Sequence, residues 1–332
     1  MKRTPTLIFA LLVTATALAH EPATPRHGYR TDEKLALRGA IKQLVDYFAC
    51  DTLASGELVP DTTKSIYVVF DFDRAGNVVK EVYHFLNNGS KCQDGEIHYL
   101  YNEQNRCIEE RRGGFNATHF VYDDRGLLIA QYEVDDEGRK VNHWAHDYNK
   151  KGQKIKSYPV DPDWEYIYEQ YKYDRAGNVI KESRRYSNGK LYETKKMRYD
   201  KQGRLIDYRK QARRKDMRLG YLRRHESVIF DYTPHQHTTY RYDERGNCVE
   251  EISYFPVNEI RTTRIREFDA MDNCVDERFY QESGESLLRH SHYTCQYEYD
   301  AQGNWIKCAK SIVRNGKAQV VDVALRQISY YE

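Results

Sequence analysis

From about Ser65 to the C-terminus, hydrophobic and polar positions alternate in short runs that polar turn sequences interrupt. Alternation of this kind predicts strands with one face more buried than the other. One interruption, YDRAGNVI at residues 173–180, recurs with conservative changes in eight other places. The nine copies begin at Phe72, Tyr101, Tyr122, Tyr148, Tyr173, Tyr199, Tyr242, Phe268 and Tyr299.

Each copy has the chemistry of a tight turn between two strands. The second position is always Asp or Asn, whose side chain can bond the backbone amides ahead of it. The fifth position is predicted to be left-handed, which suits Gly in seven copies. The other two copies have Asn105 and Asp272, the residue types that tolerate this conformation best after Gly. The eighth position is Val or Ile in every copy, as expected for packing on a pleated sheet.

The spacing of the copies predicts the architecture. The copies at Tyr122, Tyr148, Tyr173 and Tyr199 lie 26, 25 and 26 residues apart, with shorter turn sequences such as SNG at 187–189 between copies. Each unit is therefore a hairpin followed by a return turn, and nine units imply about eighteen strands, which an open sheet carries only by curling. We predict an all-β repeat array of about nine antiparallel β-hairpin units at residues 65–332, forming a curled, elongated meander sheet with one short N-terminal helix.

The N-terminal residues have the pattern of an export signal. Lys2 and Arg3 precede an apolar run that ends at Ala17-Leu18-Ala19, which predicts a signal peptide at 1–19 cleaved near Ala19 and a secreted or periplasmic protein. No later stretch of the mature chain is apolar over the length of a membrane-spanning helix. Residues 20–31 are read as a linker.

Residues 32–55 are interpreted as an amphipathic helix that caps the array. Leu37, Ile41, Leu44, Val45 and Phe48 recur at helical spacing. Such a helix needs a surface to dock on, and the first strand edge of the array is the expected one. A helix that binds a partner protein is the alternative.

The turn motif resembles the YD repeats of the RHS family: Tyr-Asp, two variable residues, then Gly followed by Arg or Asn. The resemblance covers most of the mature chain. It implies a secreted or surface-located β-hairpin array, which in large members forms a shell around a toxin or serves adhesion and carbohydrate contact. The chain is short, has no Asp-Pro-x-Gly-Leu junction, and has no toxin-like domain after the last repeat, so no toxin activity is carried over.

An irregular basic insertion at about 207–238 breaks the period between Tyr199 and Tyr242. A run of cations interleaved with tyrosine can bind an anionic polymer. We predict a ligand-binding set of Arg209, Lys210, Arg213, Arg214, Lys215, Arg218 and Tyr221. In the alternative, these cations pair with Glu and Asp on neighbouring strands.

Other chemistry is sparse in the sequence. Two His-x-His pairs, His235 with His237 and His290 with His292, place imidazoles on one strand face, but no further ligand completes a metal site. No motif for a nucleophile, an acid pair or a phosphate loop is recognisable, so we expect no catalytic residue, no metal and no cofactor. A formal net charge of +2 gives no general attraction to nucleic acid.

The cysteines of an exported chain are disulfide candidates, and there are seven of them. Cys295 and Cys308 flank one turn on two antiparallel strands. If Tyr297 and Tyr299 share a face with Ile306, these two cysteines lie directly or diagonally opposite. We predict that they form a disulfide that ties down the last hairpin.

Together these patterns predict a non-enzymatic exported repeat protein whose Tyr-rich sheet surface binds an anionic glycan or a protein of the cell envelope, and not nucleic acid. A structural envelope component without a specific ligand is one alternative. A hydrolase that uses an unrecognised carboxylate pair in a sheet groove is the other.

Overall fold

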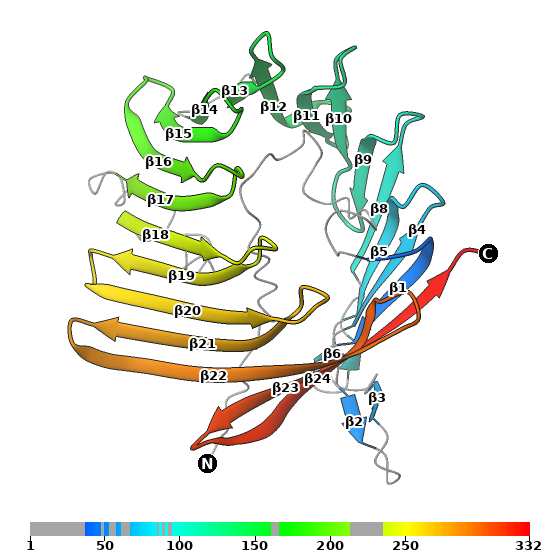
Figure 1. Ribbon diagram of the computed structural model, residues 1–332. Helices are drawn as coiled ribbons and strands as arrows, with labels where there is room; N and C mark the ends of the chain where they lie inside the picture. Colours follow the sequence, from blue (N-terminus) through cyan, green and yellow to red (C-terminus); the bar gives the residue numbers. More distant parts are fainter. Residues whose placement is uncertain are drawn as a thin grey trace.

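The computed structural model describes residues 37–47, 67–84, 95–160, 166–212 and 235–332, and the short strand segments 50–52, 58–60, 86–87 and 90–91. Twenty strands form one antiparallel sheet that closes into a barrel (Figure 1). The barrel strands are β1 (Ile41–Tyr47), β4 (Tyr67–Phe72), β5 (Val78–His84), β8 (Gly95–Tyr101), β9 (Cys107–Arg112), β10 (Thr118–Tyr122), β11 (Leu128–Val134), β12 (Lys140–Tyr148), β13 (Lys154–Pro159), β14 (Ile167–Tyr173), β15 (Val179–Tyr186), β16 (Leu191–Tyr199), β17 (Leu205–Ala212), β18 (His235–Tyr242), β19 (Cys248–Phe255), β20 (Ile260–Phe268), β21 (Cys274–Ser283), β22 (Ser286–Tyr299), β23 (Trp305–Arg314) and β24 (Lys317–Tyr330). Two small pairs lie apart from it: β2 (Cys50–Thr52) with β3 (Leu58–Pro60), and β6 (Leu86–Asn87) with β7 (Ser90–Lys91).

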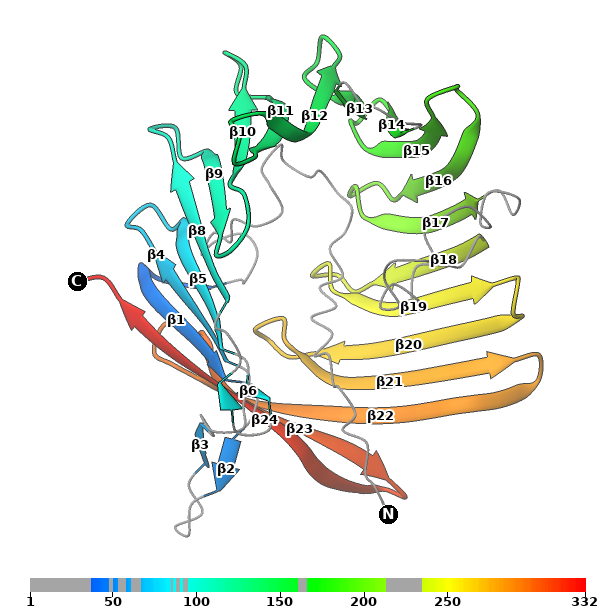
Figure 2. The same ribbon diagram turned by 180° about the vertical axis from the view of Figure 1, so that it is seen from behind.

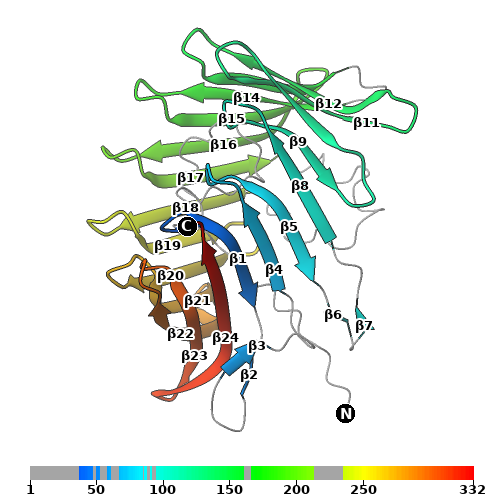
Figure 3. The same ribbon diagram turned by 90° about the vertical axis from the view of Figure 1, so that its right-hand side faces the viewer.

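Each barrel strand pairs with the next barrel strand along the chain, and β1 pairs with both β4 and β24 (Figures 2 and 3). The prediction of a curled, elongated meander sheet is therefore wrong, since the sheet closes into a barrel. Closure removes both edges of the sheet, and with them the row of unpaired backbone groups that an open array exposes.

The predicted N-terminal helix is also wrong, since Ile41–Tyr47 is a strand and the described residues contain no helix. The helical spacing has a specific cause. A register shift between Ile41 and Gln43 inserts an extra residue into β1, so Ile41 and Leu44 are both buried although they are three positions apart. A β-bulge thus imitates the spacing of a helix. The predicted signal peptide and linker lie outside the described residues, and no described helix is long and apolar enough to cross a membrane.

The predicted turn geometry is confirmed in all nine copies. In every copy, Oδ1 of the Asp or Asn at the second position accepts the backbone N–H of the sixth position, at 2.8–3.0 Å. The fifth residue has a positive φ throughout, including Asn105 at 56° and Asp272 at 66°. The buried residue after the turn is, however, the seventh rather than the eighth: Val78 is 0 % exposed, whereas Ile180 is 38 % exposed.

The first-position tyrosine joins one hairpin to the preceding one. Its hydroxyl donates to the backbone carbonyl of the seventh residue of the preceding copy, at 2.7–2.9 Å. Six tyrosines do so: Tyr101, Tyr122, Tyr148, Tyr173, Tyr199 and Tyr242. The repeated aromatic residue therefore carries a repeated contact between units.

The barrel closes through a tenth unit that is divided between the two ends of the chain. Tyr330 pairs with Ile41 as the first position of a copy pairs with the seventh, and Gly39 at the fifth position has φ 86°. The N–H of Tyr331 donates to the carbonyl of Ala40 at 2.7 Å, as the second position donates to the sixth in the intact copies. β24 and β1 are thus the two strands of a hairpin whose turn is interrupted.

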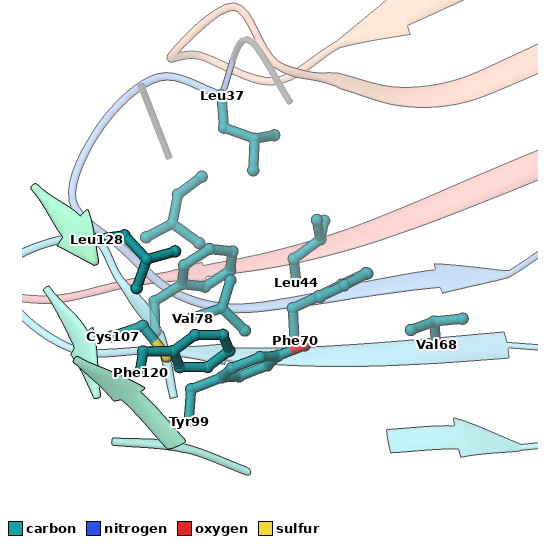
Figure 4. Close-up of a cluster of buried hydrophobic side chains, with 11 residues drawn as sticks. Leu37, Leu44, Val68, Phe70, Val78, Tyr99, Cys107, Phe120 and Leu128 are labelled. Carbon is teal, nitrogen blue, oxygen red and sulfur yellow. The ribbon is translucent and has the colours of Figure 1, made fainter. Parts of the chain in front are cut away.

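Most strongly buried strand residues share one face of the sheet: Leu44, Asp46, Val68, Phe70, Glu81, Tyr99, Glu110, Phe120, Met197, Lys210, Thr238, Arg266 and Arg326. Side chains crowd together on the concave side of a closed sheet, so we call this the inner face. Figure 4 shows its apolar part, in which residues from β1, β4, β5, β8, β9, β10 and β11 form one cluster.

Candidate binding surface

The inner face is lined with ion pairs that satisfy one another. Glu169 bonds Arg184 at 3.0 Å and Glu182 bonds Lys195 at 2.8 Å. Further along the chain, Arg266 on β20 bonds Glu277 on β21 at 3.0 Å. Because these charges are compensated within the protein, they are less able to pair with a charged ligand.

Two buried carboxylates, Glu81 and Glu110, lie on this face. Among the described residues, they are the candidates for the carboxylate pair of a hydrolase. Glu81 accepts the hydroxyl of Tyr99 at 2.9 Å, and Glu110 accepts Nε of Arg112 at 2.6 Å. Burial raises the pKa of Glu81. Glu81 is 2 % and Glu110 4 % exposed, and Tyr99 belongs to the hydrophobic cluster.

The outer face has a different character. It carries charged side chains on many strands, such as Lys156, Lys172, Arg241 and Arg278. Between these charges, rings and cations contact each other across β10 to β15. We call this set the aromatic strip: His119, Tyr132, Lys140, His143, Lys156, Tyr158, Tyr168 and Arg185.

Tyr132 is the centre of the first half of the aromatic strip. Its ring centroid lies 5.4 Å from that of His119 on β10 and 5.7 Å from that of His143 on β12. The Nζ of Lys140 stands 4.0 Å above the same ring. Three adjacent strands thus present two kinds of ring and one cation.

Lys156 is the centre of the second half. Its Nζ lies 4.3 Å from the ring of Tyr158 and 5.0 Å from the ring of Tyr168. Tyr168 pairs across the strands with Arg185, whose guanidinium bonds Gln170 and the carbonyl of Gly189. In the described part of the chain, neither Lys140 nor Lys156 forms an ion pair with a carboxylate, although Asp147 on β12 stands opposite Lys156 on β13.

The aromatic strip crosses five interstrand spacings, which is about 24 Å at ~4.8 Å per spacing. Its rings are half-buried, so packing holds them in place while part of each side chain stays exposed. Such a surface suits an extended polymer, because aromatic faces contact apolar ring faces while cations contact anionic groups.

The structure separates the two described members of the predicted basic set. Lys210 lies on the inner face, 7 % exposed, with its Nζ 3.3 Å from Glu193. Arg209 lies on the outer face and bonds Asp207 through Nε at 3.0 Å. The two cannot share a binding surface, because successive side chains of a strand point to opposite faces. Arg213, Arg214, Lys215, Arg218 and Tyr221 lie outside the described residues.

Three of the four histidines in the His-x-His pairs contact other side chains of the protein. His237 bonds Asp207 at 3.0 Å and His292 bonds Asp276 at 2.6 Å, while the ring of His290 stacks on Tyr280 at 4.7 Å. Among the described residues, no group of three or more His, Cys, Asp or Glu side chains is arranged to hold a metal ion.

Sequence reasoning missed the aromatic strip. Its members come from six strands and span residues 119–185, and no contiguous motif contains them. The sequence shows an aromatic residue on each of several successive strands. Only the register of those strands shows that the rings lie on one surface.

No protein-family model matches the sequence, and neither does a curated protein. The chain is similar in structure to a porin-like protein from Bacteroides uniformis, with 11% identity over 87% of this chain and 98% of that one, and a TM-score of 0.37. It is similar to a TcdB2-TccC3-Cdc42 structure, with 12% identity over 79% of this chain but 16% of that one, and a TM-score of 0.34. A porin-like protein from Bacteroides vulgatus gives 10% identity and a TM-score of 0.16.

Proposed function

We propose that this protein is an exported, non-enzymatic barrel that binds an anionic glycan of the cell envelope along the aromatic strip. The observation that carries the proposal is the pair of lysines, Lys140 and Lys156, standing over tyrosine rings without an ion-pair partner among the described carboxylates. The signal-peptide pattern and the resemblance to YD repeats favour an envelope location.

The chemistry of the surface favours a glycan with carboxylate or phosphate groups. Half-buried tyrosine rings can contact the C–H side of sugar rings. Burial together with the carboxylate of Asp147 raises the pKa of Tyr158, whose hydroxyl donates to Asp147 and so helps to hold the ring in place. Ammonium groups then contact the anionic substituents. The repeated spacing of strands matches a ligand that is itself a repeating chain.

Glycan arrays and binding to purified anionic envelope polysaccharide test the proposal. Truncation of a central aromatic contact typically costs about 2 kcal/mol, so Tyr132→Ala and Tyr158→Ala should each weaken binding roughly 30-fold. Lys156→Gln should weaken binding and reduce its salt dependence. Tyr280→Ala, which removes a ring stacked on His290 elsewhere on the barrel, is the matched control and should bind like the original chain.

If every variant bound the glycan with full affinity, the aromatic strip would be rejected as the binding site. Absence of binding by the original chain to any array glycan would favour a structural envelope role. Equal binding to neutral and anionic glycans would reject the role given to the lysines.

A further inference from the structure

Cys295 and Cys308 lie together on the inner face of the last long hairpin. Cys295 on β22 stands opposite Lys310 on β23, and Tyr297 stands opposite Cys308. The two cysteines are therefore diagonal neighbours on one face. Both are free thiols in this structure, and each affects the pKa of the other.

The surroundings make the two thiols unequal. The hydrogen bond from Cys308 and the ammonium of Lys310 lower the pKa of Cys295 to about 7, although burial opposes the shift. The same pairing raises the pKa of Cys308. The groups that face Cys295 are Cys308 and Lys310 on β23, Tyr297 on β22, and Glu277 and Cys274 on β21.

The other described cysteines contrast with this pair. The thiols of Cys107, Cys248 and Cys274 each donate to the backbone carbonyl two residues further on, at 3.4–3.5 Å. Burial raises the pKa of Cys107 and of Cys274 to about 12. These three thiols are neutral and internally bonded, so they serve as controls within the same chain.

We propose that Cys295 and Cys308 form a thiol–disulfide exchange site that reacts with a small-molecule or protein disulfide. The Cys295 thiolate attacks one sulfur of that disulfide, which forms a mixed disulfide and releases the other sulfur as a thiolate. Cys308 gives its proton to the released thiolate and attacks the Cys295 sulfur. The Cys295–Cys308 bond forms, the second thiolate leaves, and the two electrons lost by the protein reduce the external disulfide to one thiol and one thiolate.

The diagonal geometry indicates a reversible bond rather than a structural one. Diagonal neighbours on antiparallel strands are about 7–8 Å apart, whereas the Cα atoms of a disulfide are usually within about 6.8 Å. The bond therefore requires the strands to shift, and strained disulfides are the more easily reduced ones. This sets the site apart from a permanent disulfide that ties down the hairpin.

Alkylation of the full mature chain by iodoacetamide, in a Cys50→Ser/Cys92→Ser background, tests which thiol reacts. At pH 7 a thiol with a pKa of about 7 has roughly 50 times the thiolate fraction of one with a pKa of 9, and its lower nucleophilicity reduces the advantage to roughly sixfold. Peptide mapping should show Cys295 reacting first, with a midpoint near pH 7. Lys310→Gln should raise that midpoint and Lys310→Arg should restore it.

Oxidised glutathione tests the exchange itself. It should convert the pair to an internal disulfide that reduced glutathione at millimolar concentration reopens, and Cys308→Ser should trap a glutathione adduct on Cys295. Faster alkylation of Cys308 than of Cys295, or an internal disulfide that glutathione does not reopen, would overturn the proposal. Neither result bears on glycan binding, which uses the outer face of other strands.

Discussion

The ion pair between Asp46 and Arg326 is the clearest place to test how the barrel closes. The two residues pair directly across β1 and β24, and Arg326 bonds Asp46 through Nε at 2.7 Å and through Nη2 at 3.1 Å. The side chain of Arg326 is 6% exposed, and its guanidinium stacks 3.6 Å from the ring of Trp305. This contact joins residues 280 positions apart.

Removal of one partner should cost more than removal of both. Asp46→Ala leaves a buried guanidinium without its carboxylate, which typically costs 3–5 kcal/mol. The stack on Trp305 remains and offsets part of this, so we expect a loss of about 3 kcal/mol, or a roughly 150-fold shift in the opening equilibrium of β1. The double variant Asp46→Leu/Arg326→Met should recover most of the loss, because neutral side chains of similar volume replace a buried ion pair at little cost.

Hydrogen exchange read by mass spectrometry is the appropriate assay, since it reports opening strand by strand. In Asp46→Ala, exchange should accelerate in β1 and β24 and remain unchanged in β14 to β17. Glu298→Ala is the matched control: it removes a surface pair with Lys307 at 2.5 Å, with Glu298 62% exposed, and should cost less than about 1 kcal/mol. If the double variant is as unstable as Asp46→Ala, or if exchange rises equally around the barrel, closure through this pair is refuted.

Four further outcomes follow from the structure. Tyr148→Phe should lower the free energy of unfolding by about 1 kcal/mol in urea, because the carbonyl of Leu128 loses its partner, whereas Tyr132→Phe should not; equal effects would argue against the contact between units. Lys210→Met should cost about 3–5 kcal/mol by leaving Glu193 buried and unpaired, and Arg209→Ala less than about 1 kcal/mol; the reverse order in thermal unfolding would contradict the assignment of faces. Gly246→Asn should be tolerated better than Gly246→Val, since φ there is 96° and Asn105 already occupies the same turn position; similar melting temperatures would count against the left-handed requirement. Burial raises the pKa of Glu81, so the folded state holds its proton more tightly and stability falls as the pH rises from 4.5 through that raised pKa; Glu81→Gln should remove this fall from the pH profile of urea unfolding, and an unchanged profile would exclude Glu81 as its source.

Much of the local structure could be predicted from the sequence. The nine turns form because a carboxylate or amide, a residue that tolerates positive φ and a strand former stand at fixed positions within eight residues. The strands between the turns follow from the alternation of polar and apolar side chains. These interactions join residues that are close in the chain, so the sequence specifies them directly.

The tenth unit, which is divided between two distant segments of the chain, was not recognised from the sequence. RGAI at residues 38–41 resembles the second half of a copy, such as RGLL at 125–128, and YY at 330–331 stands where a copy begins. Read as one motif, these segments would have predicted closure. Read separately, the first fitted a helix because the bulge at Ile41 places apolar residues three apart.

Only the tertiary structure decided closure, the separation of the faces and the aromatic strip. Closure depends on pairing between β1 and β24, whose register is set by contacts such as that of Asp46 with Arg326. The faces depend on which side of the curved sheet is concave, and this sends Lys210 inward and Arg209 outward although they are neighbours in sequence. Local turn chemistry acts within eight residues, whereas closure and curvature arise from the pairing of all twenty strands, and no single stretch of sequence contains that information.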